Sequence, residues 1–95
     1  MKKIVGNLLY DTEKSEMIVR FEEFKYERRS AFHPVEILRV ECALYRTKNG
    51  RFFKLYDIGG KNEDIRPVIE IDVKEFLINH HADIYVKLFN DVKDA

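Results

Sequence analysis

The stretch from residue 37 to residue 57, ILRVECALYRTKNGRFFKLYD, decides the fold. Two runs of alternating side chains, 37–47 and 51–57, flank Lys48-Asn49-Gly50. Alternation with a period of two is typical of strands, and Asn-Gly is the favoured pair of a two-residue type I′ turn. We therefore predict a β-hairpin in which Asn49 and Gly50 form the turn and Tyr45 lies opposite Lys54.

This register gives the hairpin two faces of different character. One face carries only apolar side chains and is predicted to form the core. The other face carries aromatic and basic side chains, where a solvent-exposed face is usually polar. The core face holds Leu38, Val40, Cys42, Leu44, Phe53 and Leu55, and the second face holds Ala43, Tyr45, Thr47, Phe52, Lys54 and Tyr56.

The rest of the chain supplies the other elements of a single domain, residues 1–95. We expect short strands at 3–9 and 68–71, an alternating strand at 17–25 and a charged loop at 26–36. Asp72 followed by Glu75 is typical of a helix start, and apolar residues at helical spacing predict a second helix from Ala82. The predicted fold class is α+β, an antiparallel sheet of about 4–5 strands covered on one side by two C-terminal helices.

Composition limits the classes of function. Of the 95 residues, 45% are hydrophobic, which is enough for a folded core. Lys plus Arg and Asp plus Glu both number 17, and this balance disfavours a globally basic nucleic-acid binder. One cysteine fits a reducing compartment, and no apolar run is long enough to cross a bilayer. We therefore expect a soluble cytoplasmic protein with no membrane contact.

Charge is nevertheless distributed unevenly along the chain. Residues 25–54 hold eight basic and three acidic side chains, whereas residues 55–95 hold five basic and nine acidic ones. A basic hairpin with aromatic rings can stack on bases and contact phosphates, or it can anchor a protein partner. Alternatively, other parts of the chain cover these rings. The candidate partner-binding residues are Arg28, Arg29, Tyr45, Arg46, Lys48, Arg51, Phe52, Lys54 and Tyr56.

Other reactive residue types form no recognisable catalytic pattern. Cys42 lies within an apolar strand and is expected to be buried and inert. The segment Gly59-Gly60-Lys61 lacks the spacing of a phosphate-binding loop and is predicted to be a turn. We expect neither enzymatic activity nor a cofactor.

The histidines are the residues that could still bind a metal. His80 and His81 are consecutive on a predicted helix, so their side chains point about 100° apart and do not readily share one ion. Folding would have to bring His33 or Asp83 beside them to complete a site. The alternative, which we favour, is that they only close the end of the helix.

Two stretches of the chain resemble small uncharacterised proteins from Gram-positive bacterial chromosomes, prophages and other mobile elements. They are 9–16, LYDTEKSE, and 44–53, LYRTKNGRFF. The common order is Tyr-Asp-Thr-Glu, then Leu-Tyr-Arg-Thr-Lys-x-Gly-x-aromatic-Phe, then a Gly-Gly loop and a short strand entering a helix. The resemblance covers nearly the whole chain, but the charged segment 22–36 is not part of the pattern.

The resemblance implies a context rather than a set of site residues. Accessory proteins of such elements are similar in size and style to inhibitors of host defence, including anti-CRISPR proteins that act on Cas9-type nucleases. It therefore implies a non-enzymatic module that binds a large host protein and either occludes a nucleic-acid channel or blocks a conformational step. The alternative is a small nucleic-acid-binding regulator that uses the basic hairpin. The chain would be a monomer or a homodimer, with Phe24, Tyr26 and Phe32 either folded onto the core or forming a dimer contact.

Overall fold

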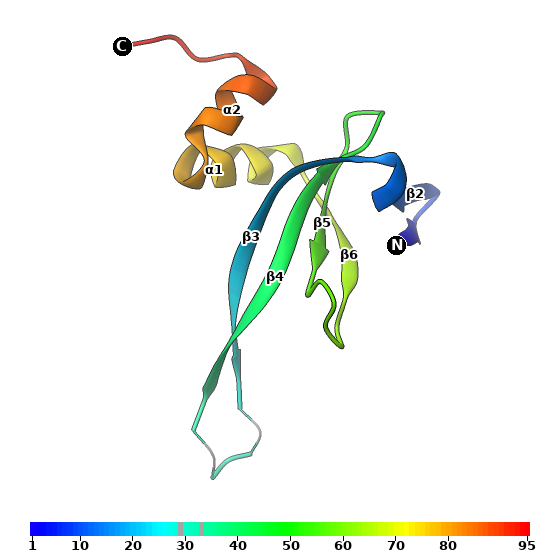
Figure 1. Cartoon of the computed structure of the whole chain (residues 1–95), viewed down its shortest axis with the longest axis vertical. Helices are drawn as coiled ribbons and strands as arrows, with labels where there is room; N and C mark the ends of the chain where they lie inside the picture. The colour runs from blue at the N-terminus through cyan, green and yellow to red at the C-terminus, as the bar shows by residue number, and fades with distance from the viewer. Residues whose placement is uncertain (29, 33) are drawn as a thin grey trace.

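Four strands form an antiparallel sheet in the computed structural model, which describes residues 1–28, 30–32 and 34–95 (Figure 1). They are arranged in the order β3-β4-β5-β6. Two helices follow the last strand, so the predicted α+β class is confirmed. The elements are β3 Glu16–Glu27, β4 Glu36–Arg46, β5 Phe52–Tyr56, β6 Asp64–Val68, α1 Glu70–His80 and α2 Ala82–Phe89.

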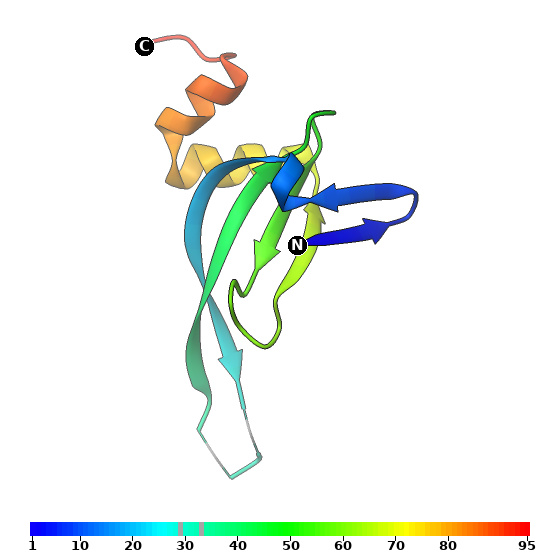
Figure 2. The same ribbon diagram turned by 45° about the vertical axis from the view of Figure 1, so that its right-hand side comes forward.

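A second, two-stranded sheet precedes the main one and projects from its side (Figure 2). It consists of β1 (Lys2–Val5) and β2 (Leu8–Asp11), and a 3-10 turn at Thr12–Lys14 leads from it to β3. We predicted one strand over 3–9. The chain instead reverses at Gly6, whose φ of 62° is a conformation that glycine adopts without strain.

The β1–β2 hairpin is attached to the main sheet by polar and aromatic contacts. The Nζ of Lys3 donates to Oδ1 of Asp64 at 2.8 Å and to the carbonyl of Ile65 at 3.2 Å. The ring of Tyr10 packs edge-on against Phe53, with 5.6 Å between ring centroids. These contacts hold the hairpin against part of the face that carries Phe53.

Strands β3 and β4 continue beyond the rest of the sheet as a two-stranded projection, which we call the arm and define as residues 24–39 (Figures 1 and 2). We predicted a charged loop over 26–36, but strand pairing continues as far as Glu27 and Glu36. The radius of gyration is 15.7 Å, whereas a compact domain of this length has about 12 Å. The arm gives the molecule this extended shape.

The β4–β5 hairpin forms, but our predicted register is wrong by one residue. Tyr45 lies opposite Phe53, and Leu44 lies opposite Lys54. The turn is a three-residue loop, 48–50, in which the amide of Gly50 donates to the carbonyl of Thr47 at 3.0 Å. Gly50 has a φ of 81°, as the left-handed third residue of such a loop requires.

The register shift changes which side chains share a face, because a slip of one residue turns every side chain of a strand over. Our predicted faces are therefore wrong for β5. One face of the sheet buries Ala43, Tyr45, Phe53 and Leu55 together with Tyr10 and Ile65. The opposite face buries Val40, Cys42, Leu44, Phe52 and Tyr56. The sheet thus has a core on both sides.

The two helices cover one side of the sheet, as predicted, but the covered face carries Leu44 together with Phe52, which we had placed on the opposite face. Val73 and Leu77 of α1 and Tyr85 of α2 are buried against these two residues. Helix α1 begins at Glu70 rather than at Asp72, two residues before the predicted start. In the described ranges, no helix has the length and apolar character needed to cross a membrane.

The last strand lies earlier in the chain than we predicted. We expected it after Pro67, over 68–71, but β6 spans Asp64–Val68 and includes the proline. Pro67 pairs with Phe53, and β6 is the outermost strand of the sheet. An edge strand tolerates proline, because the missing amide can face away from the ladder.

Candidate protein-interaction surface

The three aromatic residues that we predicted as partner anchors are buried. Tyr45, Phe52 and Tyr56 are 8%, 4% and 7% exposed. Tyr45 stacks on Phe53, Phe52 packs near Phe89 with ring centroids 6.1 Å apart, and the guanidinium of Arg66 lies 3.7 Å from the centre of the Tyr56 ring. Of the alternatives left open by the sequence, burial is the one observed for these rings, because both faces of the sheet are covered.

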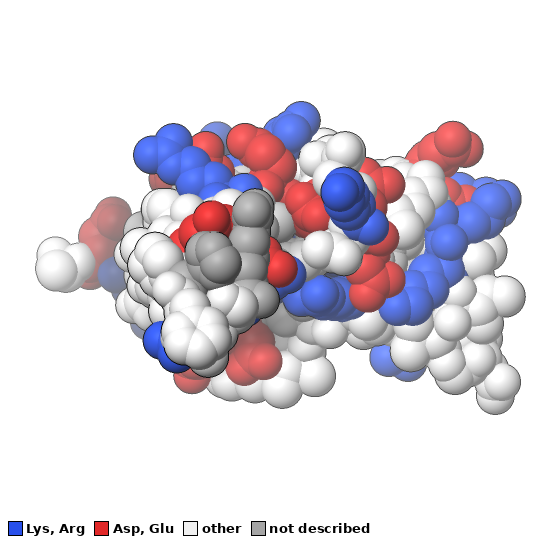
Figure 3. Space-filling view, turned by 90° about the horizontal axis from the view of Figure 1, so that it is seen from below, with Lys and Arg blue, Asp and Glu red and all other residues white. Residues whose placement is uncertain are grey.

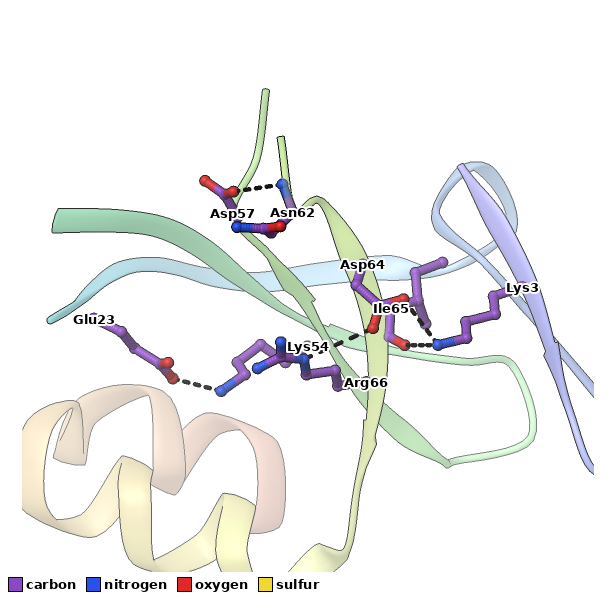
Figure 4. Close-up of polar contacts among 8 residues, drawn as sticks. All are labelled: Lys3, Glu23, Lys54, Asp57, Asn62, Asp64, Ile65 and Arg66. Atoms are coloured by element: carbon purple, nitrogen blue, oxygen red, sulfur yellow. Dashed lines mark hydrogen bonds and ion pairs between the residues drawn. The ribbon is translucent and has the colours of Figure 1, made fainter. Parts of the chain in front are cut away.

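Two of the predicted basic residues are paired with carboxylates. Arg46 Nη2 lies 2.9 Å from Oε2 of Glu16, and Lys54 Nζ lies 2.5 Å from Oε1 of Glu23. Figure 4 shows the Lys54 pair reaching from β5 across to β3. Carboxylates of the same chain partly neutralise these two cations. The positive potential at this surface is therefore weaker than the number of basic residues in the sequence indicates.

The remaining predicted cations do not gather into one patch. Lys48 and Arg51 are exposed at the β4–β5 loop, and Arg28 is exposed near the tip of the arm. The loop and the tip lie at opposite ends of β4 (Figure 1). Arg29 lies outside the described residues. Seen from below, Lys and Arg side chains are interleaved with Asp and Glu side chains (Figure 3).

Three of the exposed apolar side chains of the arm lie together on one of its faces. Phe24, Tyr26 and Ile37 are 59%, 71% and 61% exposed. Tyr26 lies directly opposite Ile37, and Phe24 lies opposite Arg39 in the same pairing. Residues two apart on a strand share a face, so these side chains are neighbours. We call Phe24, Tyr26, Ile37 and Arg39 the arm face.

Ion pairs lie where the arm joins the rest of the described chain, which we call the body. Arg39 Nε lies 3.9 Å from Glu22 Oε2, and Arg20 Nη2 lies 3.3 Å from Glu41 Oε2. Both pairs are largely exposed. An apolar centre with a polar, charged margin is the usual anatomy of a protein–protein contact.

Sequence reasoning only partly identified the arm face. Phe24 and Tyr26 were recognised as able to fold onto the core or to contact another molecule, together with Phe32. They do not fold onto the core, and Phe32 is 97% exposed. Ile37 and Arg39 were missed as surface residues. The alternation in 22–27, which continues the pattern of 17–25, was the signal that the strand extends into the arm.

The other residues with reactive side chains have structural surroundings. Cys42 is fully buried, as predicted, and burial raises the pKa of its thiol. The rings of His80 and His81 lie against Phe76, at 5.4 Å and 5.5 Å between centroids. His33 lies outside the described residues. Within the described residues, no three His, Cys, Asp or Glu side chains are grouped so as to hold a metal ion.

The Gly59-Gly60-Lys61 segment is a turn, as predicted, and neighbouring carboxylates hold it in place. The amide of Gly59 donates to Oε2 of Glu63 at 2.7 Å, and the amide of Asn62 donates to Oδ2 of Asp57 at 2.9 Å (Figure 4). These carboxylate oxygens accept hydrogen bonds from the loop's own backbone.

Comparisons of this chain with protein-family models, with curated proteins and with solved structures each find no match.

Proposed function

We propose that this chain is a non-enzymatic protein-binding module that contacts a larger protein through the arm face. The observation that carries the proposal is the exposure of Phe24, Tyr26 and Ile37 on one side of a projecting hairpin. Neighbouring exposed apolar side chains on a small soluble domain commonly mark an interaction site. Aromatic residues and arginine are also the residue types that contribute most to binding energy at protein interfaces.

The shape of the molecule supports this proposal. The body contains the part of the sheet that the helices and the β1–β2 hairpin pack against, and the arm extends from it. The molecule therefore measures 52, 38 and 20 Å along its principal axes. A projecting hairpin can enter a groove that a compact domain of the same size cannot reach. The exposed cation Arg28 near the arm tip would then contribute contacts at the margin, where charge affects the association rate more than affinity.

A protein partner fits the surface better than the alternative, nucleic acid. Binding of single strands needs exposed rings for stacking and a continuous basic groove. Tyr45, Phe52 and Tyr56 are buried, and Arg46 and Lys54 are paired with carboxylates. The aromatic residues of the arm are exposed, but Glu22 and Glu41 lie beside them in ion pairs with arginines.

The more specific proposal is that the partner is a bacterial defence nuclease of the Cas9 type, and that this chain inhibits it. The resemblance of 9–16 and 44–53 to mobile-element proteins supports this choice. Inhibition would follow if the bound chain occluded the nucleic-acid channel or blocked a conformational step. The acidic helical end, which lies opposite the arm tip in Figure 1, has the charge that a phosphate-binding channel attracts.

The test is a calorimetric titration of the purified chain into a guide-loaded Cas9-type nuclease, at moderate and at high salt. We expect saturable binding in a fixed ratio, weakened at least about 30-fold by the double variant Tyr26→Ala/Ile37→Ala. The matched control is Ile4→Ala/Leu9→Ala, which truncates two exposed residues that pair across the β1–β2 hairpin and should bind normally.

The outcomes separate the two levels of the proposal. Binding to a different large protein with the same loss in the arm variant would keep the arm as the contact surface and reject the nuclease. Equal binding by the arm variant and the control would reject the arm face. Affinity for DNA or RNA that falls steeply with salt would favour the nucleic-acid regulator instead.

A further inference from the structure

The outer edge of β3 is unpaired within the described residues. β3 is the outermost strand on its side of the sheet, and its pairing with β4 is regular from Val19 to Glu27, beyond the bulge at Met17. The opposite edge strand, β6, contains Pro67, a common device against pairing with another chain. β3 contains neither proline nor glycine. Its backbone groups therefore form a template for a further strand.

The exposed part of this edge lies in the arm and its base. Near the body, Ile18, Val19 and Phe21 pack beneath the helices. Phe21, Glu22 and Glu23 line a groove together with Phe76, His80 and His81 at the end of α1. Beyond this groove, the arm runs away from the helices with no element on its outer side (Figures 1 and 2). The outer edge of β4 is less open, because the amide of Ile58 donates to the carbonyl of Glu41 at 2.9 Å.

A second copy of this chain can pair with β3 in few registers. Two antiparallel copies related by a two-fold axis place one residue opposite itself, and the residues on each side of it pair reciprocally. With Phe24 at the axis, Glu23 faces Lys25 of the second copy, and Lys25 faces Glu23 of the second copy. Opposite charges and aromatic pairs directly across a ladder are both favourable.

The neighbouring registers are unfavourable. An axis at Glu23 opposes two glutamates, and an axis at Lys25 opposes two lysines. An axis at Glu22 again opposes two glutamates. An axis at Tyr26 leaves only residues 25–27 paired, because β3 ends at Glu27. Centred on Phe24, residues 21–27 of both copies pair within the strand.

The charged side chains are available for this pairing. Lys25 is half-buried and forms no ion pair with any residue that the structure describes. Glu23 contacts Lys54 through Oε1, so Oε2 remains free to accept from a second ammonium group. This edge therefore favours a partner strand in which a basic residue directly follows an aromatic residue. β3 itself is such a strand, because Lys25 follows Phe24.

We propose that two copies of this chain associate through the outer edges of their β3 strands, with Phe24 of each copy at the two-fold axis. The two sheets then form one continuous sheet, and the two arm faces lie side by side. This inference uses the strand edge, and it does not depend on the larger partner proposed above.

Disulfide trapping tests the register directly. The native cysteine, Cys42, is fully buried and should not cross-link. Under mild oxidation, Phe24→Cys should form a disulfide-linked dimer. The matched control Tyr26→Cys has the more exposed position, but it faces Glu22 of the second copy and should remain monomeric. Equal or faster cross-linking of Tyr26→Cys would overturn the proposed register.

Sedimentation equilibrium of the unmodified protein tests the association itself. We expect a concentration-dependent monomer–dimer equilibrium. Lys25→Glu should weaken the association about tenfold, because both Glu23–Lys25 pairs become repulsive. Lys61→Glu makes the same charge change in the exposed Gly59-Gly60-Lys61 turn and should leave the equilibrium unchanged. A protein that remains monomeric at every accessible concentration would overturn the proposal without affecting the arm-face experiment.

Discussion

The ring of Tyr45 lies parallel to the ring of Phe53, with an interplanar angle of 2° and 5.0 Å between centroids. The two residues are directly opposite each other in the β4–β5 ladder, so the rings can stack only in this backbone register. Tyr10 packs edge-on against the second ring. A register with Tyr45 opposite Lys54 would break this cluster, which is why the three-residue loop prevails over the tighter turn.

The loop type predicts different responses at its two small residues. Gly50 has a φ of 81°, whereas Asn49 has an ordinary negative φ. A Cβ at Gly50 would meet no atom within 4 Å, so Gly50→Ala should cost only the left-handed backbone conformation, about 1–2 kcal/mol of the free energy of unfolding. Asn49→Ala should change it by less than about 0.5 kcal/mol. Urea unfolding measures both, and equal losses would indicate a type I′ turn.

The thiol of Cys42 is predicted to be unreactive in the folded protein. Burial raises its pKa above the ordinary value of 9.0, so the thiolate is scarce at pH 8, and the side chain is fully covered. A colorimetric disulfide reagent should label it only after denaturant is added. Rapid labelling of the native protein would contradict the buried position.

The Lys3–Asp64 contact predicts a pH dependence of stability. The hydrogen bond from Lys3 lowers the pKa of Asp64 below its ordinary value of 3.8. A carboxyl group with a depressed folded-state pKa stabilises the fold above its unfolded pKa and loses that contribution as the pH falls through the folded pKa. Asp64→Asn should therefore be slightly less stable than the parent at pH 7. The difference should shrink as the pH falls below 3.8 and vanish below the lower pKa that Asp64 has in the folded protein.

This pH effect is measured as the difference in free energy of unfolding between parent and variant, from neutral to acid pH. Glu75→Gln is the control, because Glu75 is exposed and forms no ion pair within the described residues. Both groups in the Lys3–Asp64 pair are themselves partly exposed, so the effect should also shrink in high salt. A difference that persists unchanged in acid would show that the charge of Asp64 is not what stabilises the fold.

Truncating one aromatic residue in the body and one in the arm should have very different effects on the free energy of unfolding. Phe53 is fully buried, so Phe53→Ala should lower the free energy of unfolding by about 3–5 kcal/mol. Tyr26 is 71% exposed, and Tyr26→Ala should change it by less than about 0.5 kcal/mol. Thermal and urea unfolding provide the comparison. A large loss for Tyr26→Ala in dilute protein would mean that the arm packs against the body.

The fold class was predictable because it depends on local periodicity. Alternation in 37–57 and helical spacing after Asp72 reflect which side chains face the core, and both patterns appear in the structure as β4, β5 and α1. The register was not predictable from Asn-Gly alone, since the same dipeptide fits a two-residue turn and the end of a three-residue loop. Choosing between them requires knowing that Tyr10 arrives against Phe53.

The candidate surface was less predictable than the fold for a related reason. Whether Tyr45, Phe52 and Tyr56 are exposed depends on what covers each face of the sheet. One cover is the β1–β2 hairpin, held by a contact between Lys3 and Asp64 that are 61 residues apart. The other is the pair of C-terminal helices. The sequence shows that aromatic residues occupy alternating positions along the strands. Long-range packing decides which of their rings are exposed to solvent.

The arm lies apart from the buried clusters, so its sequence can vary without disturbing the core. The clusters that hold the body together draw their buried members from outside residues 24–39. Substitutions in the arm should therefore have little effect on folding and act mainly on binding. Such a chain can exchange one set of contacts for another while its scaffold stays fixed. For an engineer, the same division makes residues 24–39 the place to graft a new binding hairpin.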